Sequence, residues 1–248
     1  MPVENSVRSV GRTFELLAVF DAAHPFPTLR DLVERSGLPK TTVVRLLSTL
    51  ERRGLVSARE DGRYSLGPGF LPWVRVAESL WDVNDATRRI MQALVDDIGE
   101  TVNVYVRQGV TRMSIAQQEG THTVRNVVEV GKPMPLWGGS ASTILLSAAP
   151  EVIDAVAEAG RTPAASLRDR VKAADEAGFA VSVGERELGA AAISAPIRNS
   201  DGRLLAALSM SGPSTRFTDD LLERGISAIT DAAKTISTVG LGSVEALL

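Results

Sequence analysis

The sequence contains no cysteine and only two histidines, His24 and His122. Without cysteine there is no disulfide, no thiolate nucleophile and no cysteine metal site, which agrees with a reducing cytoplasm. The two distant histidines do not have the spacing of zinc ligands, and neither has the adjacent nucleophile that acyl transfer requires. We therefore expect no metal site, no cofactor and no catalytic residue.

Long apolar runs are also missing. No run approaches the ~18 residues that cross a bilayer, and the polar N-terminus lacks the apolar core of a signal peptide. We expect a cytoplasmic protein with no membrane partner. With 248 residues and 44% hydrophobic content, the chain can form one large domain or two smaller ones, each with its own core.

A strong charge of one sign is absent, because the formal net charge is only −3. Residues 1–69 hold ten Lys and Arg against eight acids, a net charge of +2, whereas the remaining 17 bases and 22 acids give −5. This asymmetry is modest, so an argument for DNA binding depends on where the bases lie.

The stretch 37–55, GLPKTTVVRLLSTLERRGL, has the pattern of an amphipathic helix. One face is apolar and consists of Val43, Leu46, Leu47 and Leu50. The opposite face carries hydroxyls and guanidiniums, from Thr42, Arg45, Thr49 and Arg52. Such groups hydrogen-bond base edges and phosphates, so we interpret this segment as a DNA-reading helix.

Two further helices are predicted before it. The spacing of apolar residues indicates a first helix over about 6–22, and Thr28 with Asp31 has the form of a capping box that opens a second helix, which Gly37 ends. Pro39 suits the first position of the third helix. The first amides of that helix would then form a phosphate cradle at Lys40, Thr41 and Thr42.

A hairpin is predicted next, because segments 55–59 and 63–66 flank the turn signal Asp61-Gly62. Three helices and a hairpin make a winged helix-turn-helix over residues 1–69. We expect Arg45 to read a base, flanked by Thr42 and Thr49. Phosphate contacts are expected from Arg8, Arg12, Lys40, Thr41 and Arg63. The alternative is a three-helix protein-interaction or dimerisation module whose basic face is only solvated.

A connector follows the first domain, which Gly67-Pro68-Gly69 closes, and residues 70–83 are predicted to form a linker helix. Trp73 and Trp81 in this connector are hard to leave in water. They either belong to the core of the second domain or form a contact between two copies of the chain.

Residues 84–248 are predicted to form an α+β domain with an antiparallel sheet, because hairpin-joined strands flank a group of helices. The expected strands are 101–108, 113–117, 124–130, 179–183, 190–198 and 203–211. The expected helices are 84–98, 140–147, 151–159, 165–177 and a final helix capped by Thr218.

Residues 135–142, PLWGGSAS, indicate a binding pocket. Two glycines permit close backbone approach, the helix that starts there offers free amides to a carboxylate, and Trp137 is a candidate apolar wall. The other interpretation is a tight strand-to-helix turn in which the glycines serve only geometry. The run Glu185-Arg186-Glu187 is likewise either a pocket gate or a solvated turn.

The sequence resembles the IclR family of bacterial transcriptional regulators over nearly its whole length. The resemblance rests on GLPKTTVVRLLSTLERRGLV at 37–56, GRYSLG at 62–67, GFAV at 178–181, ISAPIR at 193–198 and AALSMSGP at 206–213. It implies a winged helix-turn-helix followed by a GAF-like effector-binding domain, assembled as a homodimer or homotetramer on double-stranded operator DNA.

The resemblance also implies an effector site beside Trp137. Its members are main-chain amides at Ser140 and Ala141 and side chains at Ser182, Ala192, Ser209 and Ser211. Trp137-Gly138-Gly139 stands where many relatives have a His-Ala-Thr/Ser run, Ser182 where an acid is common, and Ala192 where a cysteine is common. We therefore expect a less polar pocket that favours a small aromatic or apolar organic acid, or an amide-like relative, over a compact polar 2-oxo acid.

The function expected from these features is that of an effector-responsive, DNA-binding transcriptional regulator that recognises a pseudo-palindromic operator. The alternative is a DNA-binding or interaction protein that responds to no effector. A small-molecule enzyme is the third interpretation, and the missing nucleophile and base argue against it.

Overall fold

The structure is a computed structural model, and it describes residues 7–21 and 23–248. The chain divides into two compact units, residues 1–79 and 80–248. The expected domain boundaries after residues 69 and 83 stay predictions, and the two units are described in turn.

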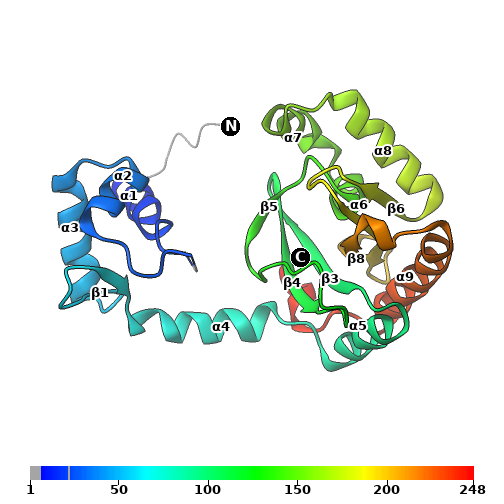
Figure 1. The fold of residues 1–248 in the computed structure, drawn as a ribbon, viewed down its shortest axis with the longest axis horizontal. Helices are drawn as coiled ribbons and strands as arrows, with labels where there is room; N and C mark the ends of the chain where they lie inside the picture. Colours follow the sequence, from blue (N-terminus) through cyan, green and yellow to red (C-terminus); the bar gives the residue numbers. More distant parts are fainter. Residues whose placement is uncertain (1–6, 22) are drawn as a thin grey trace. The chain divides into compact units, whose positions relative to one another are not determined.

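The N-terminal unit is a winged helix-turn-helix, as predicted (Figure 1). Its elements are α1 (Arg8–Leu17), α2 (Leu29–Ser36), α3 (Lys40–Arg52), β1 (Val56–Ala58) and β2 (Tyr64–Leu66). A 3-10 turn η1 (Pro68–Phe70) leads into α4 (Leu71–Trp81). The N-terminal limit predicted for the first helix lies outside the described residues, and α1 itself ends at Leu17, short of the predicted 22.

Local sequence signals explain the limits of α2 and α3. The Thr28 amide donates to Asp31 Oδ2 at 2.8 Å, and the Asp31 amide donates to Thr28 Oγ1 at 3.2 Å, which completes the predicted capping box. The hydrogen bonds that the Thr28 amide and the Thr28 hydroxyl donate to the Asp31 carboxylate lower the pKa of this carboxyl. Gly37 ends α2 with a φ of 67°, a left-handed conformation that glycine adopts without strain. Pro39 precedes α3 as its N-cap residue, so its predicted place at the first helical position was wrong by one residue.

The wing is a two-stranded antiparallel hairpin whose strands pair Val56 with Leu66 and Ala58 with Tyr64. It is fixed to the rest of the unit because the Tyr64 amide donates to the Pro27 carbonyl at 2.9 Å, just before α2. A small apolar core joins the wing to the helices. Its buried members are Leu16, Val19, Leu32, Leu38, Val43, Leu47, Leu50 and Val56.

The C-terminal unit is an α+β domain built on a six-stranded antiparallel sheet, as predicted. The strand order is β5-β4-β3-β8-β7-β6. The strands are β3 (Thr101–Gln108), β4 (Thr111–Gln118), β5 (Pro133–Pro135), β6 (Ala180–Val183), β7 (Ala190–Arg198) and β8 (Leu204–Pro213). The helices are α5 (Asp85–Ile98), α6 (Ser140–Ser147), α7 (Ile153–Gly160), α8 (Ala164–Ala177) and α9 (Asp219–Val239), with 3-10 turns at Pro150–Val152, Ser214–Arg216 and Ser243–Leu247.

The strand predicted over 124–130 is absent, and the third strand along this sheet edge is β5 instead. Val124, Val127 and Val130 are all more than half exposed. The segment is held through side chains, because the Val128 amide donates to Gln117 Oε1 at 2.8 Å. The valine content of the segment therefore predicted a strand that does not form.

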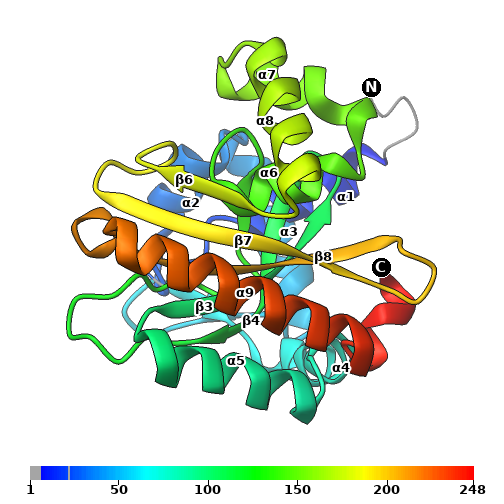
Figure 2. The same cartoon turned by 90° about the vertical axis from the view of Figure 1, so that its right-hand side faces the viewer.

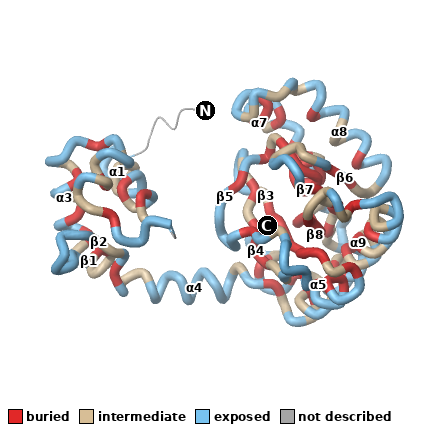
Figure 3. The backbone as a smooth tube through the Cα atoms, viewed as in Figure 1, coloured by how far each residue is buried: buried red, intermediate tan, exposed pale blue. Residues whose placement is uncertain are grey.

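The two faces of the sheet are covered differently. Helices α5 and α9 lie across one face (Figure 2), where they pack on a large apolar core. Helix α6, backed by α7 and α8, covers the other face. Strands β7 and β8 are buried along most of their length, whereas α4 is exposed from Leu71 to Leu80 and only its last residue, Trp81, is partly buried (Figure 3).

Strand β4 contains a β-bulge. Val104 of β3 pairs with Ala116, but the next residue, Tyr105, pairs with Ser114, so Ile115 is an extra residue in β4. The bulge changes the phase of β4, and it places Arg112 and Ser114 on the same face of the sheet as Tyr105.

The two connector tryptophans have different environments. Trp81 packs against the core of the C-terminal unit, as one of the two interpretations expected. Trp73 is 62% exposed, so the contact between copies stays a prediction for this residue. No single helix among the described residues is long and apolar enough to cross a membrane, and the one bent pair of suitable composition, Ser140–Ser147 with Pro150–Gly160, turns by 116° at its break.

Candidate DNA-reading surface and effector cavity

The outer face of α3 presents the side chains predicted to read DNA. Lys40, Thr41, Arg45 and Thr49 are exposed, and Thr42 is half-buried. The Thr49 hydroxyl donates to the Arg45 carbonyl at 3.0 Å, which leaves its oxygen as an acceptor. The Thr42 amide donates to the Pro39 carbonyl at 2.8 Å, so the predicted phosphate cradle has free amides only at Lys40 and Thr41.

Two residues of this face were missed by the sequence analysis. Val44 is 46% exposed although it is apolar, and Ser48 is exposed one turn further along α3. Their spacing from Thr41, three and seven residues, was the available signal. The valine methyls can contact a thymine methyl in a major groove, and the serine can hydrogen-bond either partner of a base pair.

The remaining predicted bases lie on α1 and on the wing. Arg8 and Arg63 are exposed and Arg12 is half-buried. No ion pair joins these three arginines to a carboxylate of the described residues. Arg59, by contrast, stacks on the Phe26 ring at 4.5 Å and lies 3.6 Å from Asp61. The three unpaired guanidiniums can therefore contact phosphates, whereas Arg59 stabilises the wing.

The C-terminal unit has a small cavity of about 40 Å³ between the sheet, the start of α6 and the segment after β6. Five residues of the predicted effector site line it, namely Ser140, Ser182, Ala192, Ser209 and Ser211. Gly139 of the predicted pocket segment 135–142 also lines it, as do residues that were not predicted, namely Tyr105, Arg112, Asn126, Ala190 and Ala191.

Serine hydroxyls form a connected network beneath the cavity. The Ser140 amide donates to Ser182 Oγ at 2.9 Å, which caps the first turn of α6. Ser140 Oγ lies 2.8 Å from Ser194 Oγ, and Ser194 donates to Ser209 Oγ at 2.9 Å. At the rim, Asn126 Nδ2 donates to Ser211 Oγ at 3.2 Å. Hydroxyl groups therefore make up much of the cavity wall.

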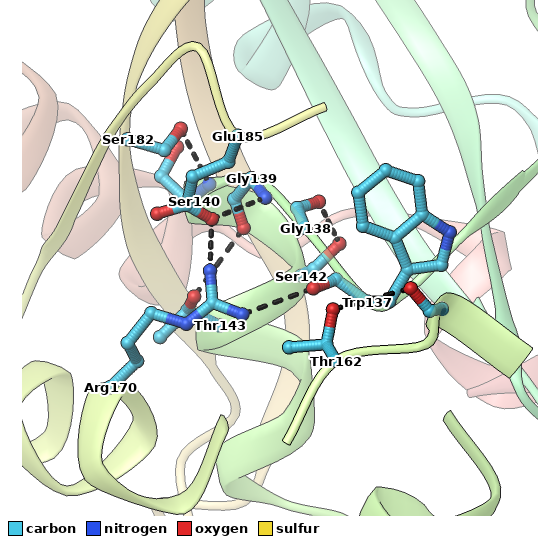
Figure 4. A network of polar contacts seen from close by, with 11 residues as sticks. Trp137, Gly138, Gly139, Ser140, Ser142, Thr143, Thr162, Arg170, Ser182 and Glu185 are labelled. Carbon is cyan, nitrogen blue, oxygen red and sulfur yellow. Dashed lines mark hydrogen bonds and ion pairs between the residues drawn. The ribbon is translucent and has the colours of Figure 1, made fainter. Parts of the chain in front are cut away.

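Trp137 and Ala141 do not line this cavity. Figure 4 shows the indole of Trp137 directed away from Ser140 and Ser182. Its side chain packs against Gly160 of α7, where a Cβ would lie only 2.2 Å from Trp137 Cβ. Ala141 is buried in the apolar core below α6. The expected apolar wall of indole is therefore not part of this cavity.

The segment Glu185–Glu187 closes one side of the cavity. Gly139 donates its amide to Glu185 Oε2 at 2.9 Å, and Arg170 of α8 pairs with the same carboxylate (Figure 4). Arg170 also donates to the Trp137 carbonyl at 3.0 Å. A carboxylate of the chain itself thus lies at the start of α6, which favours the gate interpretation over the solvated turn.

Arg112 of β4 also lines the cavity and is only 5% exposed. Its guanidinium lies over the Tyr105 ring, with Cζ 4.7 Å from the ring centroid. Burial lowers the pKa of the Arg112 guanidinium to about 10; Tyr105 partly offsets this shift and the like charge of Arg186 adds to it. Burial also raises the pKa of Tyr105. Arg112 lies one residue before the predicted start of this strand at 113, and it was not predicted as a site residue.

A winged helix-turn-helix with an exposed basic face, in one chain with a domain that encloses a polar cavity, defines a DNA-binding transcriptional regulator. Two family models match the chain, "IclR helix-turn-helix domain" over residues 9–60 and "Bacterial transcriptional regulator IclR C-terminal" over residues 76–238. The protein belongs to the IclR family. Because this family consists of transcriptional regulators, the expectation that the protein is not an enzyme is confirmed.

Individual relatives agree with this assignment. The transcriptional regulator KipR of Bacillus subtilis is 32% identical over 245 residues, which are 95% of this chain and 98% of that protein. An IclR-family regulator from Rhodococcus sp. has a crystal structure with 46% identity, 98% coverage of both chains and a TM-score of 0.66. An IclR homologue of Microbacterium hydrocarbonoxydans, solved with 4-hydroxybenzoate, shares the fold at 22% identity, with 96% and 99% coverage and a TM-score of 0.74.

Proposed function

We propose that this regulator binds a pseudo-palindromic operator as a homodimer or homotetramer, and that a small organic acid controls its DNA affinity. The observation that carries the proposal is the hydroxyl-lined cavity at the start of α6, in the same chain as a DNA-reading helix. We place its action in the cytoplasm, where a bacterial operator lies.

In the proposed complex, α3 enters the major groove and Arg45 reads a base between Thr42 and Thr49. Lys40 and Thr41 contact phosphate at the start of α3. Arg8, Arg12 and Arg63 contact phosphates on either side. Exposure of these side chains, apart from the half-buried Arg12 and Thr42, supports the assignment.

Exposed apolar residues of the N-terminal unit support the oligomer. They lie on α1 with the residue before it, and on α4, namely Val7, Val10, Phe14, Leu71, Trp73, Val74 and Val76. Apolar surface of this kind marks contacts with other proteins. A two-fold dimer would place two copies of α3 one helical turn of DNA apart, which matches a palindromic site.

Effector control requires a ligand that binds the DNA-competent and DNA-incompetent arrangements with different affinities. We propose that the ligand moves the sheet relative to α5, and that α4 transmits the change to the spacing of the two reading heads. The same effector site and the same DNA-reading helices would serve in repression and in activation.

The roles of the DNA contacts can be tested by comparing two arginines on specific and non-specific DNA. Arg45→Ala should cost about 1–3 kcal/mol on the operator and relax specificity at one position. Arg63→Ala should weaken binding to all sequences alike and flatten the salt dependence. Equal losses of specific and non-specific binding in Arg45→Ala would contradict the base-reading role.

The effector can be tested with a panel of acids. A ligand that binds only the native state raises the apparent stability of the protein. The melting temperature should therefore rise with one or more of four acids, namely 4-hydroxybenzoate, benzoate, pyruvate and glyoxylate. The same acids should change operator affinity in a footprint. Stabilisation by pyruvate and glyoxylate alone would reject the expected preference for aromatic or apolar acids, and unchanged operator affinity throughout would favour the effector-independent alternative.

A further inference from the structure

Arg112 holds a positive charge inside the cavity wall without a counter-ion. Its side chain is 5% exposed, and within residues 7–21 and 23–248 no carboxylate oxygen lies within 4.0 Å of its guanidinium nitrogens. Its Nε is buried and has no hydrogen-bond partner among these residues. Arginine is almost never found fully buried unless it is paired, so this position calls for an explanation.

The acids that line the same cavity are already paired elsewhere. Glu185 accepts from the Gly139 amide and pairs with Arg170, and Glu187 lies 3.7 Å from Arg186. Arg186, which also lines the cavity, adds a second positive charge near Arg112. The charges described around the cavity therefore leave the Arg112 guanidinium uncompensated.

The geometry leaves the donors of Arg112 available. The Tyr105 ring supports the flat face of the guanidinium, at 4.7 Å, so the N–H groups in the guanidinium plane are not used by this stack. Arg112 Nη2 lies 3.4 Å from the position that a Cβ of Gly139 would take, beside the first turn of α6. A planar fork of N–H donors matches the two oxygens of a carboxylate.

The start of α6 already accepts a carboxylate, because the Gly139 amide donates to Glu185 at 2.9 Å. The positive end of the helix dipole and the guanidinium of Arg112 thus face the same small space. A side chain at residue 139 would fill that space, and the φ of 94° also requires glycine there.

We propose that Arg112 binds the carboxylate of the effector in a bidentate pair, and that the ligand is an anion with one carboxylate and not a neutral molecule. This inference rests on the proposed effector-binding function. The cavity of about 40 Å³ holds a carboxylate group and little more, since a protein cavity known to bind benzene measures about 150 Å³. An acid with a ring therefore enters only when the segment Glu185–Glu187 moves away.

The test compares carboxylates with their uncharged amides. Wild-type protein and the variants Arg112→Met and Arg112→Lys are titrated calorimetrically with acetate, benzoate and 4-hydroxybenzoate, and with acetamide, benzamide and 4-hydroxybenzamide. We expect carboxylates to bind the wild type and the amides to bind at least ten-fold more weakly. Arg112→Met should lower carboxylate affinity about 10- to 100-fold, the factor that a charge-assisted hydrogen bond supplies. Arg112→Lys, which keeps the charge without the fork, should be intermediate.

Arg107→Met is the matched control, because Arg107 pairs with Arg112 across β3 and β4 but does not line the cavity. It should leave carboxylate affinity unchanged. The melting temperature without ligand is a second measurement, and it should stay the same or rise in Arg112→Met, because an unpaired buried charge is removed. If the melting temperature of Arg112→Met falls, and Arg112→Lys binds carboxylates as tightly as the wild type, then Arg112 has a structural role and the proposal is overturned.

The remaining outcomes separate this inference from the effector function. Equal carboxylate affinity in wild type and Arg112→Met, or binding of amides as tight as that of acids, overturns the role of Arg112 and leaves effector control intact. Failure of all three carboxylates to bind the wild type also overturns it. Carboxylate binding that depends on Arg112 but leaves operator affinity unchanged confirms the anion site and overturns the proposed effector control.

Discussion

The two faces of the six-stranded sheet have opposite characters although the same strands supply both. On the face covered by α5 and α9, alternate residues are apolar and fully buried, among them Ile193, Leu208 and Met210. On the other face, the intervening positions include the buried serines Ser194 and Ser209. Strand alternation lets one sequence build a dry core and a polar cavity back to back.

Because of this difference, one face of the sheet stabilises the domain and the other face forms the binding cavity. Apolar burial stabilises the domain at roughly 25 cal/mol per Å², whereas hydroxyls that hydrogen-bond only one another add little net free energy. The polar face also holds Arg112, whose charge is uncompensated among the described residues. We infer that the apolar face stabilises the domain strongly enough to tolerate the less stable polar face.

The largest expected effect comes from truncating neighbouring residues of β8. Leu208→Ala should lower the free energy of unfolding by about 2–5 kcal/mol, because it leaves a cavity in the apolar core. Ser209→Ala, one residue along and on the other face, should cost about 0.5–1.5 kcal/mol. Urea unfolding of both variants measures the difference, and equal losses would contradict the division between the faces.

A smaller effect is expected where the polar side is tightly packed. Gly160→Ala would place a Cβ 2.2 Å from Trp137 Cβ, so it should destabilise the domain by about 1–3 kcal/mol, although alanine normally favours a helix. The matched control is Gly11→Ala in α1, where no atom lies within 4 Å of the added Cβ. That change should stabilise the N-terminal unit by about 0.5–1 kcal/mol. Thermal unfolding of each variant shows whether Gly160→Ala lowers the stability and Gly11→Ala raises it.

The smallest expected effect is a coupling between hydroxyls. A double-mutant cycle of Ser194→Ala and Ser209→Ala should give an interaction energy of at least about 0.5 kcal/mol, because their oxygens are 2.9 Å apart. Leu208→Ala with Ser194→Ala should add within about 0.5 kcal/mol, since these side chains lie on opposite faces. Additivity in both cycles would show that the serine network does not act as a unit.

The sequence predicted the elements whose signals are local. The capping box of Thr28 and Asp31, the left-handed Gly37 and the Asp61-Gly62 turn each act within a few residues, and all lie where expected. The pairing of β7 with β8 as a hairpin agrees with the hairpin-joined strands expected for this domain, for the same reason. The pairing of β3 with β8 joins residues about 100 positions apart, and no local signal reports it.

Site residues that lie in a family motif were predicted, whereas those whose position depends on tertiary packing were missed. Ser140, Ser182 and Ser209 meet at one cavity because strand pairing and the first turn of α6 bring them together. Trp137 was expected beside them, but its side chain packs against Gly160 of α7, where a Cβ would lie only 2.2 Å from Trp137 Cβ. Residues 135–142 could not reveal a contact made by a helix that begins eleven residues later, at Ile153.

The bulge at Ile115 bears on how relatives of this protein are aligned. Deleting this one residue would leave Val104 opposite Ala116 and Tyr105 opposite Ser114, so Arg112 would still lie on the cavity face. In a strand without a bulge, loss of one codon turns every side chain beyond it to the other face. A one-residue alignment gap at Ile115 therefore marks the loss of the bulge. A relative with this shorter strand can still keep an arginine at the position of Arg112.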